Sequence, residues 1–159
     1  MKKIALLLLF SISFFASNAQ TVYICKDGDY TTRSLSEGYT LDLSSLPDSI
    51  TFSKPQITPV VTIVYNGTTA TVSIPTFLSK EVTCSSGTSS QVVIVNTNTT
   101  DEITYDVSGS SSAGSLTITS GYKMTVKLNG VTLTSTKGEA LRFKCGKRIE
   151  LEMADGTTN

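Results

Sequence analysis

The chain contains no histidine and no tryptophan, and only three of its 159 residues are cysteine. Without histidine it lacks the usual general base, the commonest zinc ligand and every Ser/His or Cys/His arrangement. A glycine-rich phosphate loop is also absent from the sequence, as is the glycine-rich nonapeptide repeat of calcium-binding β-rolls. Nucleophilic and metal-dependent hydrolysis therefore have little support, and we expect a protein that is not an enzyme.

Charge is also scarce, because Asp, Glu, Lys and Arg together make up 16% of the chain and the formal net charge is zero. No basic surplus points to a nucleic-acid partner. Hydroxyl side chains are abundant instead, with 22 Ser and 25 Thr among the 159 residues. Thr beside Val and Ile favours strands, whereas clusters of Ser and Gly favour turns. The composition therefore indicates an all-β fold.

The first 19 residues have the pattern of a secretory signal peptide. Lys2 and Lys3 precede an apolar run from Ile4 to Phe15, and small residues end the segment at Ala19. The run is shorter than the ~20 residues that span a bilayer. We therefore expect cleavage after Ala19 and a protein that is secreted, displayed at the cell surface or held in the periplasm, with no membrane span after cleavage.

Three cysteines, Cys25, Cys84 and Cys145, are an odd number for an exported protein. One disulfide and one free thiol are compatible with this count. Cys145, however, follows Leu141 and Phe143 at a period of two residues. That spacing favours a buried thiol that packs as a small apolar side chain.

The rest of the chain divides into three segments. Residues 20–56 are expected to form a leader with short strands, and residues 57–102 a hairpin and capping region. In the second segment, "VVTIVYNGTTATVSIP" alternates on both sides of Asn66-Gly67, which is a strong hairpin signal. Residues 103–159 change to short strands that end at glycines or polar corners.

Two stretches of that last segment, residues 116–128 and 141–153, carry apolar side chains at matching positions. Each matched pair is separated by 25 residues. Gly121 and Gly146 share this offset and lie where the chain has to bend. The pairs are Leu116 with Leu141, Ile118 with Phe143, Met124 with Ile149, Val126 with Leu151, and Leu128 with Met153.

A 25-residue unit of three short strands predicts a parallel β-helix, in which residue i stacks roughly 4.8 Å from residue i+25. A β-sandwich would explain alternating strands but not five apolar pairs at one offset. We expect all ten paired residues to point into one core. A Val126 or Leu151 on the solvent side, or a failure of these two residues to stack on adjacent coils, would contradict the β-helix. We also expect further coils after Asn159, so that the chain is truncated at its C-terminal end.

The charged residues of the repeat allow two interpretations. They either solvate the outside of the coils or form a binding surface for acidic sugars. The cations concerned are Lys123, Lys127, Arg142, Lys144 and Arg148. Beside them, Glu150, Glu152 and Asp155 offer oxygen ligands for calcium if a partner surface completes the shell.

Three tyrosines are candidates for stacking on sugar rings, namely Tyr65, Tyr105 and Tyr122. Tyr122 stands beside Gly121 at an expected coil corner, so it is the one we expect to be exposed. The alternative is a ring that packs the corner.

Residues 103–159 resemble the opening coils of the secreted carbohydrate-binding β-helix proteins related to pectate lyases. The motifs that carry this resemblance are "LNGVTLTS", from Leu128, and "ADGTTN", from Ala154. The resemblance implies a right-handed parallel β-helix and polysaccharide binding, and it allows a calcium ion.

These observations favour a secreted, non-catalytic protein that binds plant or other acidic polysaccharides. A β-helical surface adhesin and a pectate-lyase-like enzyme are the alternatives. The enzyme would need a basic residue such as Arg142 or Lys144 in a groove with flanking acids, and no acid lies within the same strand.

Overall fold

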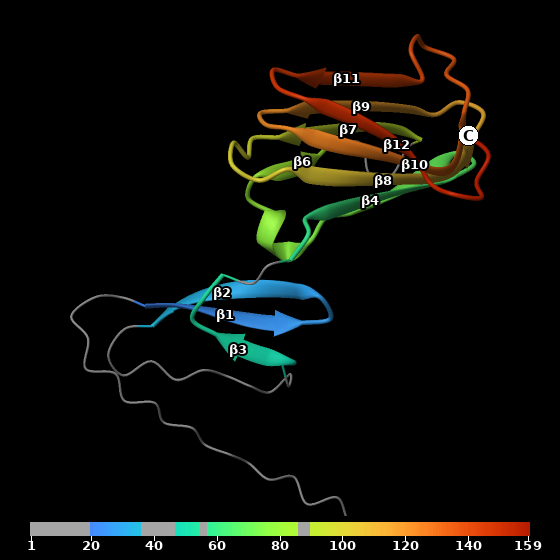
Figure 1. The fold of residues 1–159 in the computed structure, drawn as a ribbon. Coiled ribbons are helices and arrows are strands. Elements are labelled where there is room, and N and C mark those ends of the chain that lie inside the picture. The colour runs from blue at the N-terminus through green and yellow to red at the C-terminus, as the bar shows by residue number, and fades with distance from the viewer. Residues whose placement is uncertain (1–19, 36–46, 55–56, 86–89) are drawn as a thin grey trace, which may run out of the picture. The chain divides into compact units, whose positions relative to one another are not determined.

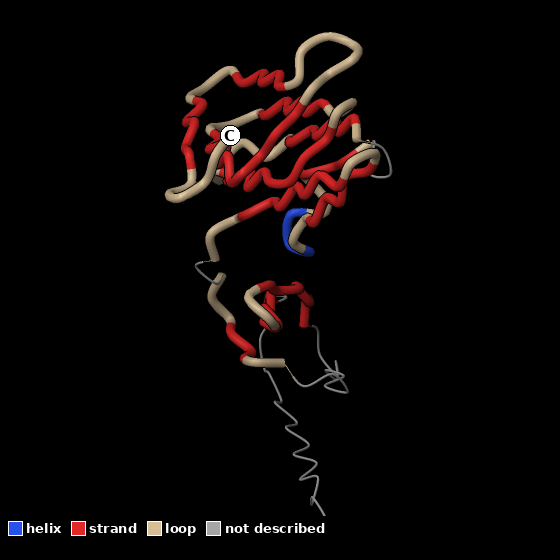
Figure 2. The backbone as a smooth tube through the Cα atoms, turned by 90° about the vertical axis from the view of Figure 1, so that its right-hand side faces the viewer, coloured by secondary structure: helices blue, strands red, loops and turns tan. Residues whose placement is uncertain are grey.

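The computed structural model describes residues 20–35, 47–54, 57–85 and 90–159. It is an all-β protein that divides into two compact units, Met1–Pro55 and Gln56–Asn159 (Figure 1). Within the described residues, the only helix is a short 3-10 turn, η1, at Thr76–Leu78 (blue in Figure 2). None of the helices in this part of the chain is long and apolar enough to cross a membrane. The expected signal peptide lies outside the described residues.

The first unit contains a three-stranded antiparallel sheet in the order β2-β1-β3. Strands β1 (Gln20–Lys26) and β2 (Asp29–Leu35) form a hairpin, and β3 (Ser49–Thr51) pairs with the other side of β1. The hairpin turn has positive φ at Asp27 and Gly28, the backbone conformation that Asp and Gly tolerate best. Inside this small sheet the rings of Tyr23 and Tyr30 meet edge to face, with their centroids 5.4 Å apart.

The second unit contains two sheets, one of five strands in the order β12-β10-β8-β4-β5 and one of four in the order β11-β9-β7-β6. The hairpins β4-β5 and β6-β7 are antiparallel, and all other pairs are parallel. The strands are β4 (Val60–Asn66), β5 (Thr69–Ser73), β6 (Val82–Cys84), β7 (Gln91–Asn96), β8 (Ile103–Ser111), β9 (Ser115–Ser120), β10 (Met124–Leu133), β11 (Leu141–Cys145) and β12 (Ile149–Met153).

The hairpin expected at Asn66-Gly67 is confirmed, with its turn shifted by one residue. Asn66 still pairs with Thr69, so Gly67 and Thr68 form the two-residue loop. Gly67 adopts a φ of 65°, which suits a turn of this kind.

The register expected from the repeat is also confirmed. Strand β9 pairs with β11 from Leu116 with Leu141 onward, and β10 pairs with β12 from Met124 with Ile149 onward, always at an offset of 25. The preceding pairs have other offsets, since Leu116 also pairs with Val92 and Met124 with Ile103. The corners between strands differ in length, so the 25-residue period applies to the last stacked pairs alone.

The expected third strand of each coil is not a separate element. Strand β10 continues to Leu133 through a shift in register between Leu128 and Val131, where Gly130 has a φ of 69°. A bulge of this kind bends a strand without ending its ladder. Gly130 therefore marks a bend within one strand rather than a corner between two.

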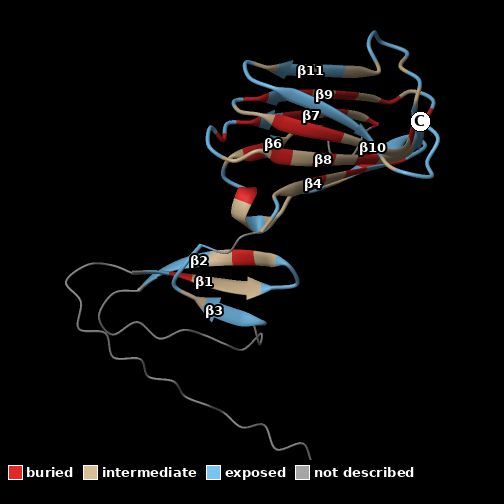
Figure 3. Ribbon diagram, in the orientation of Figure 1, coloured by how far each residue is buried: buried red, intermediate tan, exposed pale blue. Residues whose placement is uncertain are grey.

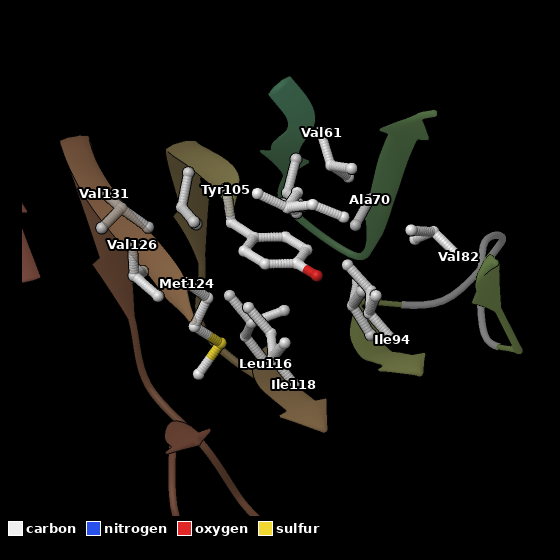
Figure 4. Packing of buried hydrophobic residues seen from close by; sticks show 14 of the residues in the cluster. Val61, Ala70, Val82, Ile94, Tyr105, Leu116, Ile118, Met124, Val126 and Val131 are labelled. Carbon is white, nitrogen blue, oxygen red and sulfur yellow. The ribbon is translucent and has the colours of Figure 1, made fainter. Parts of the chain in front are cut away.

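The core of this unit lies between the two sheets and draws on both of them. The Tyr105 ring from β8 lies among Ile94, Leu116 and Ile118 of the other sheet (Figure 4). Tyr65 spans the same space from β4, and its hydroxyl donates to the carbonyl of Ser115 on β9 at 2.8 Å. This hydrogen bond ties the two sheets together through the core.

The core expectation holds for the inner strands and fails for β12. The five expected core residues on β9 and β10 are at most 7% exposed, namely Leu116, Ile118, Met124, Val126 and Leu128. On β11, Leu141 and Phe143 are half-buried. Ile149, Leu151 and Met153 are 38%, 55% and 70% exposed. Leu151 stacks on Val126 in the expected register, but among the described residues no further strand pairs with β12. Register therefore fixes the face of a side chain, whereas burial also needs elements that cover its strand.

Candidate functional site

Charged residues stand immediately before three stacked strands of the five-stranded sheet. Glu102 precedes β8, Lys123 precedes β10 and Arg148 precedes β12, and the first residues of these strands pair with one another. Parallel pairing thus brings together residues that are 21 and 25 positions apart. We call the resulting group the corner cluster, and it consists of Glu102, Tyr122, Lys123, Thr125, Arg148 and Glu150.

Arg148 is the centre of this cluster. Its Nη2 nitrogen lies 2.9 and 3.1 Å from the two carboxylate oxygens of Glu102 and 3.3 Å from Oε2 of Glu150. The hydroxyl of Thr125 donates to the Glu102 carboxylate at 3.2 Å. The side chains of Arg148, Glu150 and Glu102 are 56%, 46% and 33% exposed. Because these three side chains remain partly exposed, a ligand in solvent can reach the corner cluster.

These contacts shift the acid-base properties of the pair. The hydrogen bond from Arg148 lowers the pKa of Glu102 below its ordinary value of 4.5, with smaller contributions from Thr125 and Lys123. The same hydrogen bond raises the pKa of Arg148. Both groups are therefore ionised at neutral pH, and the cluster offers fixed charges rather than a group that exchanges protons near neutrality.

Tyr122 supplies the aromatic part of the cluster. It is half-exposed, and the ammonium of Lys123 lies 5.7 Å from the centre of its ring. Its carbonyl accepts hydrogen bonds from the Ser120 hydroxyl at 2.8 Å and from the Cys145 thiol at 3.0 Å. These bonds hold the backbone of the corner, so the ring is presented from a fixed position. Tyr122 therefore lies at a corner as expected, with its side chain half-buried rather than fully exposed.

Tyr65 and Tyr105 are not available for stacking on sugars, because they are 2% and 0% exposed. Burial raises the pKa of both phenols, that of Tyr105 to about 12. Within the described chain the Tyr105 hydroxyl has no hydrogen-bond partner. Both residues belong to the core of the fold.

The outer face of the five-stranded sheet continues the polar surface from the cluster. Lys127 on β10 stands between Asp106 on β8 and Glu152 on β12. Asn129 donates from its amide to Asp106 at 3.3 Å. Parallel partners share one face of a sheet, so these side chains form a row beside the corner cluster.

The structure divides the cations that the sequence singled out. Lys123 and Arg148 lie in the corner cluster and Lys127 lies on the adjoining face, whereas Arg142 and Lys144 are on β11 in the other sheet. No ion pair of Arg142 or Lys144 is found within the described ranges. One continuous basic surface is therefore not formed by these five residues.

The three acids proposed as calcium ligands also occupy different places in the structure. Glu150 contacts Arg148, Glu152 is two residues further along the same strand, and Asp155 lies in the turn after it. In the part of the chain that the structure describes, no group of three or more His, Cys, Asp or Glu side chains is arranged to hold a metal ion. All three cysteines are free thiols.

Sequence reasoning missed Glu102 and Thr125. Glu102 contacts a residue 46 positions away, and the first stacking offset is 21 rather than 25. Alignment of "DEITYDV" with "YKMTVKL" at that shorter offset would have placed Glu102 beside Lys123.

The model of a family described as "Carbohydrate-binding domain-containing protein" matches residues 88–159. No curated protein matches the chain. No solved structure matches it either. The matched range includes every residue of the corner cluster.

Proposed function

We propose that this protein binds a polysaccharide through the corner cluster and the adjoining outer face of the five-stranded sheet, and that it catalyses no reaction on it. The observation that carries the proposal is that the family match covers a site where the half-buried Tyr122 stands beside charged, hydrogen-bonding side chains. Sugar rings bind proteins by stacking on an aromatic face while polar neighbours hold their hydroxyls.

The fold we infer for the matched region is a right-handed parallel β-helix of the kind found in pectate lyases. Support comes from the parallel ladders β8-β10-β12 and β7-β9-β11 and from their common core. A solenoid of this kind presents equivalent positions at the strand spacing of ~4.8 Å, which suits a repetitive polymer.

An acidic glycan is the ligand class that we favour. Lys123 and Lys127 adjoin Tyr122 on the same sheet, and within the described residues neither has an ion pair. Arg148 contributes less charge, because two carboxylates already contact it. Calcium would enter as a bridge between Glu150 or Glu152 and a sugar carboxylate, which agrees with the oxygen preference of this ion. Export by the N-terminal segment is part of the same proposal.

Affinity electrophoresis tests the proposal directly. The protein is run in native gels that contain polygalacturonate, xylan or hydroxyethyl cellulose, with calcium or with a chelator. We expect retardation by polygalacturonate, weaker retardation for Tyr122→Ala and Lys123→Ala, and near-normal retardation for Tyr122→Phe. Lys80→Ala, which removes an exposed cation outside the matched range, is the control.

The alternatives give other results. A surface adhesin would show no retardation by any glycan, and this result would overturn the proposal. A lyase would release unsaturated sugars from polygalacturonate, detected by their ultraviolet absorbance, and this would overturn the non-catalytic part.

A further inference from the structure

The outer face of the five-stranded sheet carries two rows of charged side chains that differ in character. One row belongs to the corner cluster, where Lys123 and Glu102 precede paired residues of β10 and β8. The other, which we call the Asp106 row, consists of Asp106, Lys127 and Glu152. Lys127 follows Lys123 by four residues, or ~13 Å at a rise of ~3.3 Å per residue, so the rows can contact different rings of one glycan.

Both rows are centred on strands in the interior of the sheet. Strand β8 has β4 on its other side, and β10 has β12. Along most of their length these two strands are red and tan in Figure 3, the colours of buried and half-buried residues. Their outward side chains are therefore held by paired strands on both sides.

The corner row has a positive charge available to a ligand. The ammonium of Lys123 lies 5.7 Å from the centre of the Tyr122 ring, and it has no ion pair among the described residues. The acid of this row, Glu102, already accepts hydrogen bonds from Arg148 at 2.9 Å and from Thr125 at 3.2 Å. An acidic sugar can therefore lie beside Tyr122 with its carboxylate against Lys123.

The Asp106 row offers hydrogen-bond acceptors instead. The half-buried carboxylate of Asp106 accepts one hydrogen bond, from the amide of Asn129 at 3.3 Å. Its remaining lone pairs and the side-chain carbonyl of Asn129 can accept O–H donors. Sugar hydroxyls are such donors, and their hydrogen bonds to an ionised carboxylate are of the stronger kind.

A second acidic sugar would fit the Asp106 row poorly. Lys127 stands between Asp106 on β8 and Glu152 on β12, so the row carries one cation and two acids. No ion pair of Asp106 is found in the described ranges, so its carboxylate is not neutralised by a direct contact. A sugar carboxylate placed here would be repelled by Asp106.

We propose that the site takes a glycan in which neutral sugars are interspersed among acidic ones. An acidic ring lies at Tyr122 and Lys123, and a neutral ring donates its hydroxyls to Asp106 and Asn129. This inference rests on the proposed function and narrows its ligand class, because a glycan with a carboxylate on every ring would place one against Asp106.

Polygalacturonates that differ only in their degree of methyl esterification test the inference. Each ester removes the charge of one ring and keeps the backbone and the hydroxyls. The complete chain is run in native gels that contain each polymer, with a chelator so that calcium bridges do not contribute. We expect the tightest binding at an intermediate degree of esterification, with a dissociation constant about two- to fivefold lower than for the unesterified polymer, the effect of one exposed charge pair. The fully esterified polymer should bind more weakly, because Lys123 loses its partner.

Three variants assign the effect to residues. Asp106→Asn removes the charge but keeps an acceptor for Asn129, so its tightest binding should move to the unesterified polymer. Lys123→Ala should weaken binding of the charged polymers and leave that of the fully esterified one nearly unchanged. Asp27→Asn is the matched control, because it removes the same charge from an exposed turn of the first unit, where Asn also tolerates the positive φ. It should keep the original optimum.

The possible outcomes separate this inference from the proposed function. Retardation that falls steadily with esterification would overturn the inference and leave binding of an acidic glycan intact. Retardation that rises steadily to full esterification would overturn the inference and the acidic ligand class together. An optimum that stays in place in Asp106→Asn would overturn the role of Asp106. No retardation by any of these polymers would overturn both proposals, once circular dichroism has established that the protein is folded.

Discussion

Gly109 on β8 is the position where the fold tolerates a side chain least. It has a φ of +83°, and a Cβ atom added there would lie 2.1 Å from the carbonyl oxygen of Tyr65 on the neighbouring strand β4. Gly67, in the β4-β5 turn, has a similar φ of +65° but nothing within 4 Å of its added Cβ. The two glycines therefore share a backbone conformation and differ in the space around them.

The expected effects of alanine follow from this difference. Left-handed backbone costs a residue with a Cβ roughly 1–2 kcal/mol, which is the whole expected effect of Gly67→Ala. Gly109→Ala adds a clash with backbone that only a shift of β8 away from β4 relieves, and each ladder hydrogen bond weakened costs about 1 kcal/mol. We expect a total loss of about 4 kcal/mol or more, a large part of the ~5–15 kcal/mol that stabilises a typical domain.

Urea unfolding followed by far-ultraviolet circular dichroism measures both variants. A loss in Gly109→Ala that exceeds the loss in Gly67→Ala by several kcal/mol supports the close approach of β4 and β8. Equal losses, within about 1 kcal/mol, would refute it, because the conformational cost would then account for everything. Failure of Gly109→Ala alone to fold would agree with the larger loss.

Three further predictions concern the core and the corner cluster. Tyr65→Phe should lower the free energy of unfolding by about 1–3 kcal/mol, because the partly buried Ser115 carbonyl loses its donor, as urea unfolding would show. Met124→Ala should cost about 2–5 kcal/mol and Met153→Ala well under 1 kcal/mol in the same assay, since one side chain is buried and the other 70% exposed. Glu102 should titrate below its ordinary pKa of 4.5 in carbon-detected NMR, and Arg148→Gln should move the pKa back towards that value. Because the folded-state pKa of Glu102 is lowered, the stabilisation by this pair is complete above pH 4.5 and is lost as the pH falls through the lowered value. An unchanged Glu102 titration in Arg148→Gln would contradict the view that Arg148 lowers this pKa.

Periodicity in the sequence was enough to predict the pairing of the last strands. Apolar side chains repeat at one offset only if they stack, so Leu116 and Leu141 predicted the β9-β11 register that the structure shows. The same argument predicted the wrong environment for Leu151, because a repeat says which residues stack and not whether a further strand covers them. Only the position of Tyr105 in an alternating strand indicated that its side chain would be buried.

The corner cluster was only half predictable for a related reason. Lys123 and Arg148 are separated by the 25-residue period, so their proximity follows from the repeat. Glu102 precedes the neighbouring parallel strand β8, where a shorter connection changes the offset to 21. A search at the single 25-residue period therefore could not identify Glu102 as the partner of Arg148.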